Sequence, residues 1–383
     1  MGLFGNRGLN LLVMHHMLHR FAWGGSGIFI GIYLYREGVP LPQVFLAYTA
    51  ILALRFLFRL LLPQTVAWLG LRDCLIIATA LQAVQYPMLA LVHGPDPALA
   101  LFCAVAGLGG ALYFTSYHTY FSALGDIASR GAQIGLRQIL SAMAAILGPA
   151  FGGVMLAAFG PWAAFGAAGA IEMVAILPLF GIAEIQSGPI ASLPSFAAAR
   201  TGLLLFVTDG WISNTAVLTW NLILFRSLNA RFDALGGTLA AASLAGALGG
   251  AVLGRFIDLG HARPATWINA AAAGLSLLIR SLCGDDPGVV VPVAILAALI
   301  GGLYIPALFT AFYNQAKASI SPLGYQILAE GAWDVGGLAV TVIAAAALAL
   351  GMPLQFAILL ALPAVPIQAR VLESSYSMQK SQA

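Results

Sequence analysis

Apolar runs of about 20 or more residues, divided by short polar connections, follow one another along the whole chain of 383 residues. A helix of about 20 apolar residues is long enough to cross the hydrocarbon core of a bilayer. Only 8% of the residues are charged, against about 25% in an ordinary soluble domain. A transmembrane β-barrel would alternate apolar and polar residues over segments of about ten. The sequence therefore predicts an all-α polytopic membrane protein.

Gly, Pro and charged residues divide the apolar runs into twelve predicted transmembrane helices. These spans cover roughly 10–35, 41–69, 72–93, 97–124, 134–158, 161–183, 200–226, 234–256, 265–283, 288–314, 322–350 and 353–371. The longest connection, 185–199, predicts a cytoplasmic linker between an N-terminal six-helix half, 1–184, and a C-terminal six-helix half with a short tail, 200–383.

Positive charge in the loops predicts the orientation of the chain. Ten Lys and Arg residues fall in loops on the side of the termini and four on the opposite side. This bias places both termini in the cytoplasm of a cell with a bacterial-type inner (plasma) membrane. The first apolar stretch carries Arg20 and three histidines and has no small-residue cleavage site, so we expect it to remain as a span.

The two halves resemble each other in sequence. Trp23 matches Trp211 at a shift of 188 residues, and the tripeptide from Gln138 matches the one from Gln326 at the same shift. A duplication with parallel topology is the usual organisation of a two-bundle transporter. We therefore expect two pseudo-symmetric six-helix bundles.

Two local motifs carry a family resemblance. The segment Gly254-Arg-Phe-Ile-Asp258-Leu-Gly260-His-Ala-Arg263 is similar to the loop motif that the major facilitator superfamily repeats in both halves. At the first position only Gly70 and Arg72 remain, with Ala67 in place of the acidic residue. Span five carries the second motif, Gly135, Ala144 and Gly148-Pro149-Ala-Phe-Gly152-Gly153, which resembles the antiporter motif of that family.

With twelve spans in two halves, the resemblance to the major facilitator superfamily covers the whole chain. It implies a secondary transporter in which spans 1, 4, 7 and 10 line a central cavity. It also implies that the two halves rock about a midplane site, and the span-five motif favours export by antiport over import.

Leaving aside histidines and residues near span ends, seven ionisable residues lie inside predicted spans, and six of them segregate by sign between the halves. The first half holds Arg20, Arg55 and Arg59, whereas the second holds Asp209, Glu330 and Asp334. A charge at bilayer depth is costly and commonly marks a solute pathway or a buried partner. Glu172 is the exception, and on a peripheral span it is expected to be a structural partner of a neighbour.

Basic and aromatic residues of the first half predict one wall of a substrate site. His16, Arg20 and Trp23 share one face of span 1, and Arg55 and Arg59 are one turn apart on span 2. The predicted substrate contacts in this half are Arg20, Trp23, Arg55, Tyr117 and His118. A different interpretation stays open for the residues near the membrane surface: His15 and His16 lie in the headgroup zone, or Arg59 snorkels to lipid phosphate.

Polar and acidic residues of the second half predict the opposite wall and a proton site. The predicted substrate contacts are Trp211, Asn214 and Trp220. Gly210 beside Asp209 permits local unwinding, and two carboxylates one turn apart, Glu330 and Asp334, repel each other so that one of them titrates. The predicted proton-coupling or gating residues are Asp209, Glu330, Asp334, His16, His19, Arg59 and Asp258.

Guanidinium groups bind carboxylate or phosphate in bidentate geometry. We therefore predict a proton-coupled transporter of a small organic, anionic or amphipathic solute, acting as a monomer in the bilayer with no cofactor. Sodium ions bound by Asp209 and Asn214 could replace protons as the coupling ion. The same fold and residues also allow transition-metal transport through His15, His19, His118 and Asp209, or a receptor that transports nothing.

The sequence does not favour an enzyme or a nucleic-acid-binding protein. No nucleotide-binding loop or nucleophile motif appears, so neither an enzyme nor a nucleic-acid partner is predicted. Cys74, Cys103 and Cys283 are scattered without metal-ligand or disulfide spacing.

Overall fold

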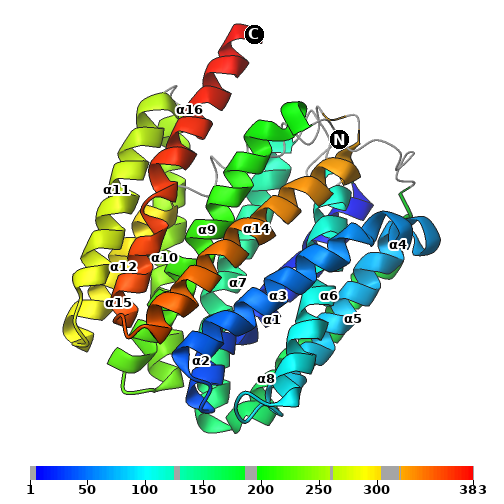
Figure 1. Cartoon of the computed structure of the whole chain (residues 1–383). Helices are drawn as coiled ribbons and strands as arrows, with labels where there is room; N and C mark the ends of the chain where they lie inside the picture. Colours follow the sequence, from blue (N-terminus) through cyan, green and yellow to red (C-terminus); the bar gives the residue numbers. More distant parts are fainter. Residues whose placement is uncertain are drawn as a thin grey trace.

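The protein is an assembly of helices in this computed structural model, which describes residues 6–124, 130–185, 196–258, 262–302, 319 and 321–382. The described part contains helices joined by turns and no β-strand, which confirms the predicted all-α class (Figure 1).

The N-terminal half contains eight α-helices and two short 3₁₀ segments among the described residues. In chain order they are α1 (Arg7–Ser26), η1 (Gly27–Phe29), α2 (Ile30–Arg36), α3 (Leu41–Leu60), α4 (Leu62–Leu69), α5 (Leu71–Leu89), α6 (Pro97–Leu124), α7 (Arg130–Ala158), α8 (Gly160–Ile176) and η2 (Leu177–Gly181).

The C-terminal half has the corresponding series. Its elements are α9 (Phe196–Ser227), α10 (Phe232–Asp258), α11 (Ala262–Leu282), α12 (Pro287–Gly302), α14 (Pro322–Ala349), α15 (Leu354–Ala357), η3 (Ile358–Ala361) and α16 (Ala364–Gln382). Each of the twelve predicted spans has a helical counterpart. Among the described residues, seven helices are long and apolar enough to cross a membrane, or eight if the bent pair α4 and α5 is one span.

The second span is shorter than predicted. A single helix over 41–69 is wrong, because α3 ends at Leu60 and α4 follows as a separate helix from Leu62. The axes of α4 and α5 then differ by 111°. The bend falls at Gly70, whose φ of +83° is unfavourable for residues with a side chain. The Glu184 carboxylate caps α5 by accepting from the backbone N–H of Leu71 at 2.6 Å and of Arg72 at 3.1 Å. Gly70 and Arg72, the surviving motif residues, thus form this helix start.

The second motif copy ends at Arg263, and the side chains of residues 253–263 lie outside the described part. Asp258, a predicted gating residue, is the last residue of α10, and nothing further is described of it.

The two halves meet along two helix crossings. In one, α3 packs against α14, and these helices lie side by side in Figure 1. In the other, α7 packs against α10. Each crossing pairs the second span of one half with the fifth span of the other half.

Glycines allow backbones to touch where helices cross. A Cβ added at Gly152 of α7 would lie 2.0 Å from the carbonyl oxygen of Gly25 in α1. One added at Gly153 would lie 2.5 Å from the carbonyl oxygen of Phe232 in α10. The span-five motif is therefore a two-sided packing surface, with one glycine facing its own half and the next facing the other half.

Gly210 serves the same purpose in the C-terminal half. The helix α9 continues through this residue, so the predicted unwinding beside Asp209 does not occur. A Cβ at Gly210 would instead lie 2.1 Å from the carbonyl oxygen of Trp333 in α14. This glycine brings Asp209 close to the carboxylates of α14.

Candidate functional site

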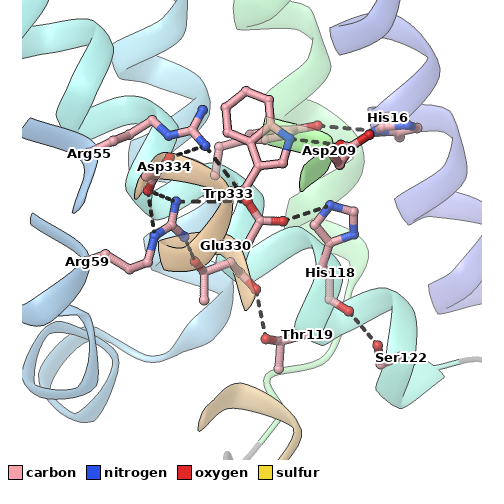
Figure 2. A network of polar contacts seen from close by, with 12 residues as sticks. His16, Arg55, Arg59, His118, Thr119, Ser122, Asp209, Glu330, Trp333 and Asp334 are labelled. Atoms are coloured by element: carbon pink, nitrogen blue, oxygen red, sulfur yellow. Dashed lines mark hydrogen bonds and ion pairs between the residues drawn. The ribbon is translucent and has the colours of Figure 1, made fainter. Parts of the chain in front are cut away.

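A buried ion-pair network joins the two halves at the α3 and α14 crossing (Figure 2). Arg55 and Arg59 are one turn apart on α3, and Glu330 and Asp334 are one turn apart on α14, so each pair shares a helix face. Asp334 lies between the arginines, and its side chain is 0% exposed. It accepts from Arg59 Nε at 3.1 Å and Nη2 at 2.9 Å, and Arg55 Nη2 lies 2.5 Å away.

Glu330 occupies a looser position in the same network. Its Oε2 atom is 3.9 Å from Nη2 of Arg55 and 3.9 Å from Nη2 of Arg59, and its Oε1 atom is 3.6 Å from Nε2 of His118. The two guanidinium charges are thus balanced by two carboxylates. Removing either partner of such a buried pair leaves an uncompensated charge, which is strongly destabilising.

Neutral residues extend the network to α6 and α9. Arg59 Nη1 donates to the Thr115 hydroxyl of α6. The Arg55 guanidinium lies over the Phe114 ring at 5.1 Å and the Trp333 ring at 4.8 Å. The Trp333 indole N–H donates to the Asp209 carboxylate at 2.9 Å. Four helices are therefore tied together around one buried charge cluster.

This network lies at the end of the molecule that carries both termini (Figure 1). The second half of α3 and of α6 and the first half of α14 come together there. The separation of basic and acidic residues between the halves thus becomes direct pairing across their interface. The interpretation that Arg59 snorkels to lipid is wrong, because its side chain is 1% exposed and is held by Asp334.

The opposite end of the interface is closed by apolar and aromatic contacts. The Phe29 ring meets the Phe232 ring edge-on at 6.1 Å, and the Arg36 guanidinium lies over Phe232 at 4.9 Å. Leu218 of α9 packs directly over Gly31 of α2. The halves therefore touch at both ends, through ions at one and through rings and aliphatic groups at the other.

The span-1 histidines gather inside the N-terminal half, and His16 also belongs to the polar network drawn in Figure 2. Nδ1 of His19 is 2.8 Å from Oε1 of Glu172, and Nδ1 of His15 is 2.8 Å from the carbonyl oxygen of Ala175. His16 stacks on Tyr117 with ring centroids 4.3 Å apart. All three histidines are buried between helices, so His15 and His16 do not face lipid head groups. Glu172 has the structural partner that its peripheral position predicted.

The other predicted substrate residues are dispersed. The Arg20 guanidinium lies 5.0 Å from the Trp23 ring centre in α1. The Trp211 indole N–H donates at 2.6 Å to the carbonyl oxygen of Leu360, within its own half. The Asn214 amide donates to the carbonyl oxygen of Gly210 at 2.8 Å. Trp220 is buried and meets the guanidinium of Arg280, 5.6 Å from its ring centre. Arg55 and His118 of the predicted substrate set belong to the network, and the Tyr117 ring packs against His118 with centroids 5.4 Å apart.

The residues proposed for metal transport form no cluster. Each of the four has a different partner. His19 contacts Glu172, and His15 contacts the carbonyl oxygen of Ala175. His118 contacts Glu330, and Asp209 accepts from Trp333. Within the described ranges, no three His, Cys, Asp or Glu side chains are grouped to hold an ion. The three cysteines are buried and form no disulfide.

Three of the network members described above, Trp333, Phe114 and Thr115, were not among the predicted site residues. Trp333 lies between the two carboxylates of α14 in sequence, and an indole donor beside two acids was a usable signal. No sequence signal marked Thr115, because a threonine in an apolar helix ordinarily donates to its own backbone.

No protein-family model and no curated protein sequence matches this chain. Solved structures do. The human organic anion transporter MFSD10 (TETRAN) is 15% identical, with a TM-score of 0.70 over 96% of this chain and 99% of that one. The major facilitator superfamily transporter FucP in the outward conformation is 13% identical, with a TM-score of 0.66 over 96% and 98%. The nucleoside transporter NupG is 15% identical, with a TM-score of 0.64 over 98% and 99%. The chain has the fold of the major facilitator superfamily transporters.

Proposed function

We propose that this protein is a proton-coupled secondary transporter that moves a small organic, anionic or amphipathic solute across an inner (plasma) membrane by alternating access. The observation that carries the proposal is the buried bond of Arg55 and Arg59 to Asp334, which ties the two halves together at one end. In a two-bundle fold, access to a midplane site changes when the halves rock against each other. A bond between the halves is therefore a gate.

Proton uptake by Asp334 couples the opening of this gate to the proton gradient. Opening the termini end, which we assign to the cytoplasm, separates Asp334 from two buried guanidinium groups. A carboxylate leaving such a site is stabilised if it takes up a proton, because a neutral carboxyl is far less costly in a low dielectric than a lone charge. Proton binding and gate opening are thus coupled at Asp334, with Glu330 as its neighbour in the same cluster.

The arginines that the open gate releases supply the solute site. Once Asp334 withdraws, Arg55 and Arg59 need another anion, and a carboxylate matches their bidentate geometry. Phe114 and Trp333 flank Arg55 and provide an apolar surface. This combination favours a small organic anion with an aromatic or aliphatic part.

The direction of solute transport relative to the protons depends on how the solute interacts with the carboxylates. For an anion, displacement of Asp334 followed by its protonation couples solute and proton in the same direction. The span-five motif instead favours export in exchange for protons, which requires a solute group that competes with the proton for Glu330 or Asp334. The sign of solute flux under an imposed pH gradient separates these schemes.

The decisive experiment uses Asp334→Asn in proteoliposomes that contain a pH-sensitive dye. A screen of organic anions, cationic drugs and divalent metals by thermal shift first supplies a transported probe. We expect the variant to lose flux driven by a pH gradient and to keep solute exchange, whereas Asp233→Asn, at an exposed ion pair with Arg231, changes neither. Unchanged dependence on the gradient in Asp334→Asn would refute the coupling assignment, and persistent dependence on sodium alone would assign the coupling ion to sodium.

Alternating access is tested without any solute. Thr119→Cys reports on the network end and Leu218→Cys on the opposite end, each in a background without the three native cysteines. We expect acid pH to raise maleimide labelling at one position and lower it at the other. A fixed pattern at every pH would indicate a receptor on the same fold instead.

A further inference from the structure

A narrow cavity of about 140 Å³ lies inside the C-terminal half, between α9, α11, α12 and α16. The helix α11 lines it along one face from Thr266 to Arg280, at spacings of three or four residues. Fourteen residues of helix extend over about 21 Å. Lining residues spread over that length suit an extended chain better than a compact sugar or nucleoside.

Among the described residues, three buried polar atoms of the side chains that line this cavity have no hydrogen-bond partner. They are Oδ1 of Asn269, Oγ of Ser276 and Nε2 of Gln368. The three side chains are 7%, 5% and 4% exposed. Buried polar groups are almost always hydrogen-bonded, and leaving them unpaired is unfavourable. Three such groups beside one cavity favour a guest that carries polar groups of its own.

Arg280 defines one end of the cavity. Its Nε donates to the backbone carbonyl of Ser276 at 3.3 Å, and its guanidinium lies over the Trp220 ring at 5.6 Å. In the part of the chain that the structure describes, no carboxylate lies within 4.0 Å of it, in contrast to Arg55 and Arg59. A guanidinium facing a cavity without a counter-ion favours an anionic head group.

The stretch between the polar positions is apolar. Ala273, Leu277 and Val365 line it. Asn269 lies eleven residues before Arg280 on the same helix, or about 16 Å along the axis. A guest that satisfies both ends has an anionic head, a slender apolar body and a second polar group at the far end.

We propose that this cavity is a second ligand site, separate from the network between the halves, for a slender monoanionic amphiphile whose carboxylate binds Arg280. Its apolar chain follows α11, and a hydroxyl at the far end bonds Asn269 or Gln368. The proposal does not depend on transport, because binding links four helices of one half whether or not the halves rock.

Binding is measured on the full chain in nanodiscs of zwitterionic lipid, with decanoate, its terminally hydroxylated analogue and decanol as probes. We expect both acids to raise the unfolding midpoint, the hydroxylated acid to bind more tightly, and decanol to bind at least tenfold more weakly. Arg280→Gln should weaken decanoate at least tenfold, whereas Arg226→Gln, at an exposed arginine of α9, should not.

A second variant tests the cavity without changing charge. Ala273→Leu fills the middle of the channel, so it should abolish decanoate binding while leaving the unfolding midpoint of the unliganded protein unchanged or higher. Equal affinity of the acid for wild type, Arg280→Gln and Ala273→Leu, or equal binding of decanol and decanoate, would overturn the proposal. Absence of any binding would overturn it as well, because the cavity would then hold only water.

Native mass spectrometry of the purified protein identifies the source of the guest. An acyl anion that copurifies with wild type and is missing from Arg280→Gln indicates uptake from the membrane. An empty protein that binds decanoate from solution indicates a water-soluble acid. Either result supports the site.

Discussion

The two crossings between the halves occupy equivalent places in the fold and use opposite chemistry. At α3 and α14, two arginines and two carboxylates meet in a buried network. At α7 and α10, Gly153 and Gly236 bring backbones together, and a Cβ at Gly236 would lie 2.4 Å from the carbonyl oxygen of Pro149. A proton can loosen the first contact, but backbone packing does not respond to pH. Under the proposed function, the first crossing is the switch and the second is a close-packed pivot.

The largest effect is expected from breaking the ionic crossing. Arg59→Gln leaves Asp334 with one guanidinium fewer in a fully buried position. Loss of one partner of a buried pair costs about 3–5 kcal/mol, which thermal or denaturant unfolding in nanodiscs measures. Arg231→Gln, at an exposed pair, is the control and should stay within about 0.5 kcal/mol.

Replacing both partners of the ion pair separates its contribution to stability from its role in the proposed switch. Arg59→Met with Asp334→Leu removes both charges and leaves Arg55 balanced by Glu330. Replacing a whole buried pair by apolar residues is often neutral. We expect unfolding stability to recover while the pH dependence of cysteine labelling disappears. If the pH dependence survives, the switch lies elsewhere, and the buried pair of His19 and Glu172 becomes the next candidate.

The glycine crossing should show a smaller and pH-independent effect. Gly236→Ala inserts a methyl group where the backbone of α7 already lies, and overpacking of this kind costs about 1–3 kcal/mol. Gly237→Ala is the matched control, because an added Cβ there meets nothing within 4 Å. Alanine in place of a helical glycine is then stabilising by about 0.5–1 kcal/mol. Equal behaviour of the two variants would contradict the pivot.

Much of this comparison was accessible from sequence. Apolar run lengths predicted the helices, and the sign of the buried charges predicted which halves would attract each other. Spacing by four placed Arg55 with Arg59 and Glu330 with Asp334 on common faces. The family resemblance predicted the overall fold.

Partner choice was not accessible, because it depends on how helices distant in sequence are rotated against each other. Lipid phosphate was therefore a possible partner for Arg59, and Trp211 was expected to face a central cavity although its indole bonds Leu360. The cavity beside Arg280 depends on four helices and left no motif. The glycines of span five were recognised as a motif, but their neighbours in α1 and α10 were not.

The smallest effect is expected from an uncharged contact in the same crossing of α3 and α14. Farther along the same two helices, the Thr49 and Thr341 hydroxyls are 2.8 Å apart, and each also lies within hydrogen-bond distance of a carbonyl of its own helix, at Phe45 and Gly337. Each hydroxyl has one hydrogen, so whichever donates to the other hydroxyl does not donate to its own carbonyl. Because the hydroxyls keep these intrahelical acceptors, Thr49→Val should cost about 0.5–1.5 kcal/mol, and Thr341→Val in addition should cost little more. A double-mutant cycle on unfolding free energy measures the coupling. A coupling as large as that of Arg59 with Asp334 would mean that the whole crossing acts as one unit, and that the charges alone do not make it the switch.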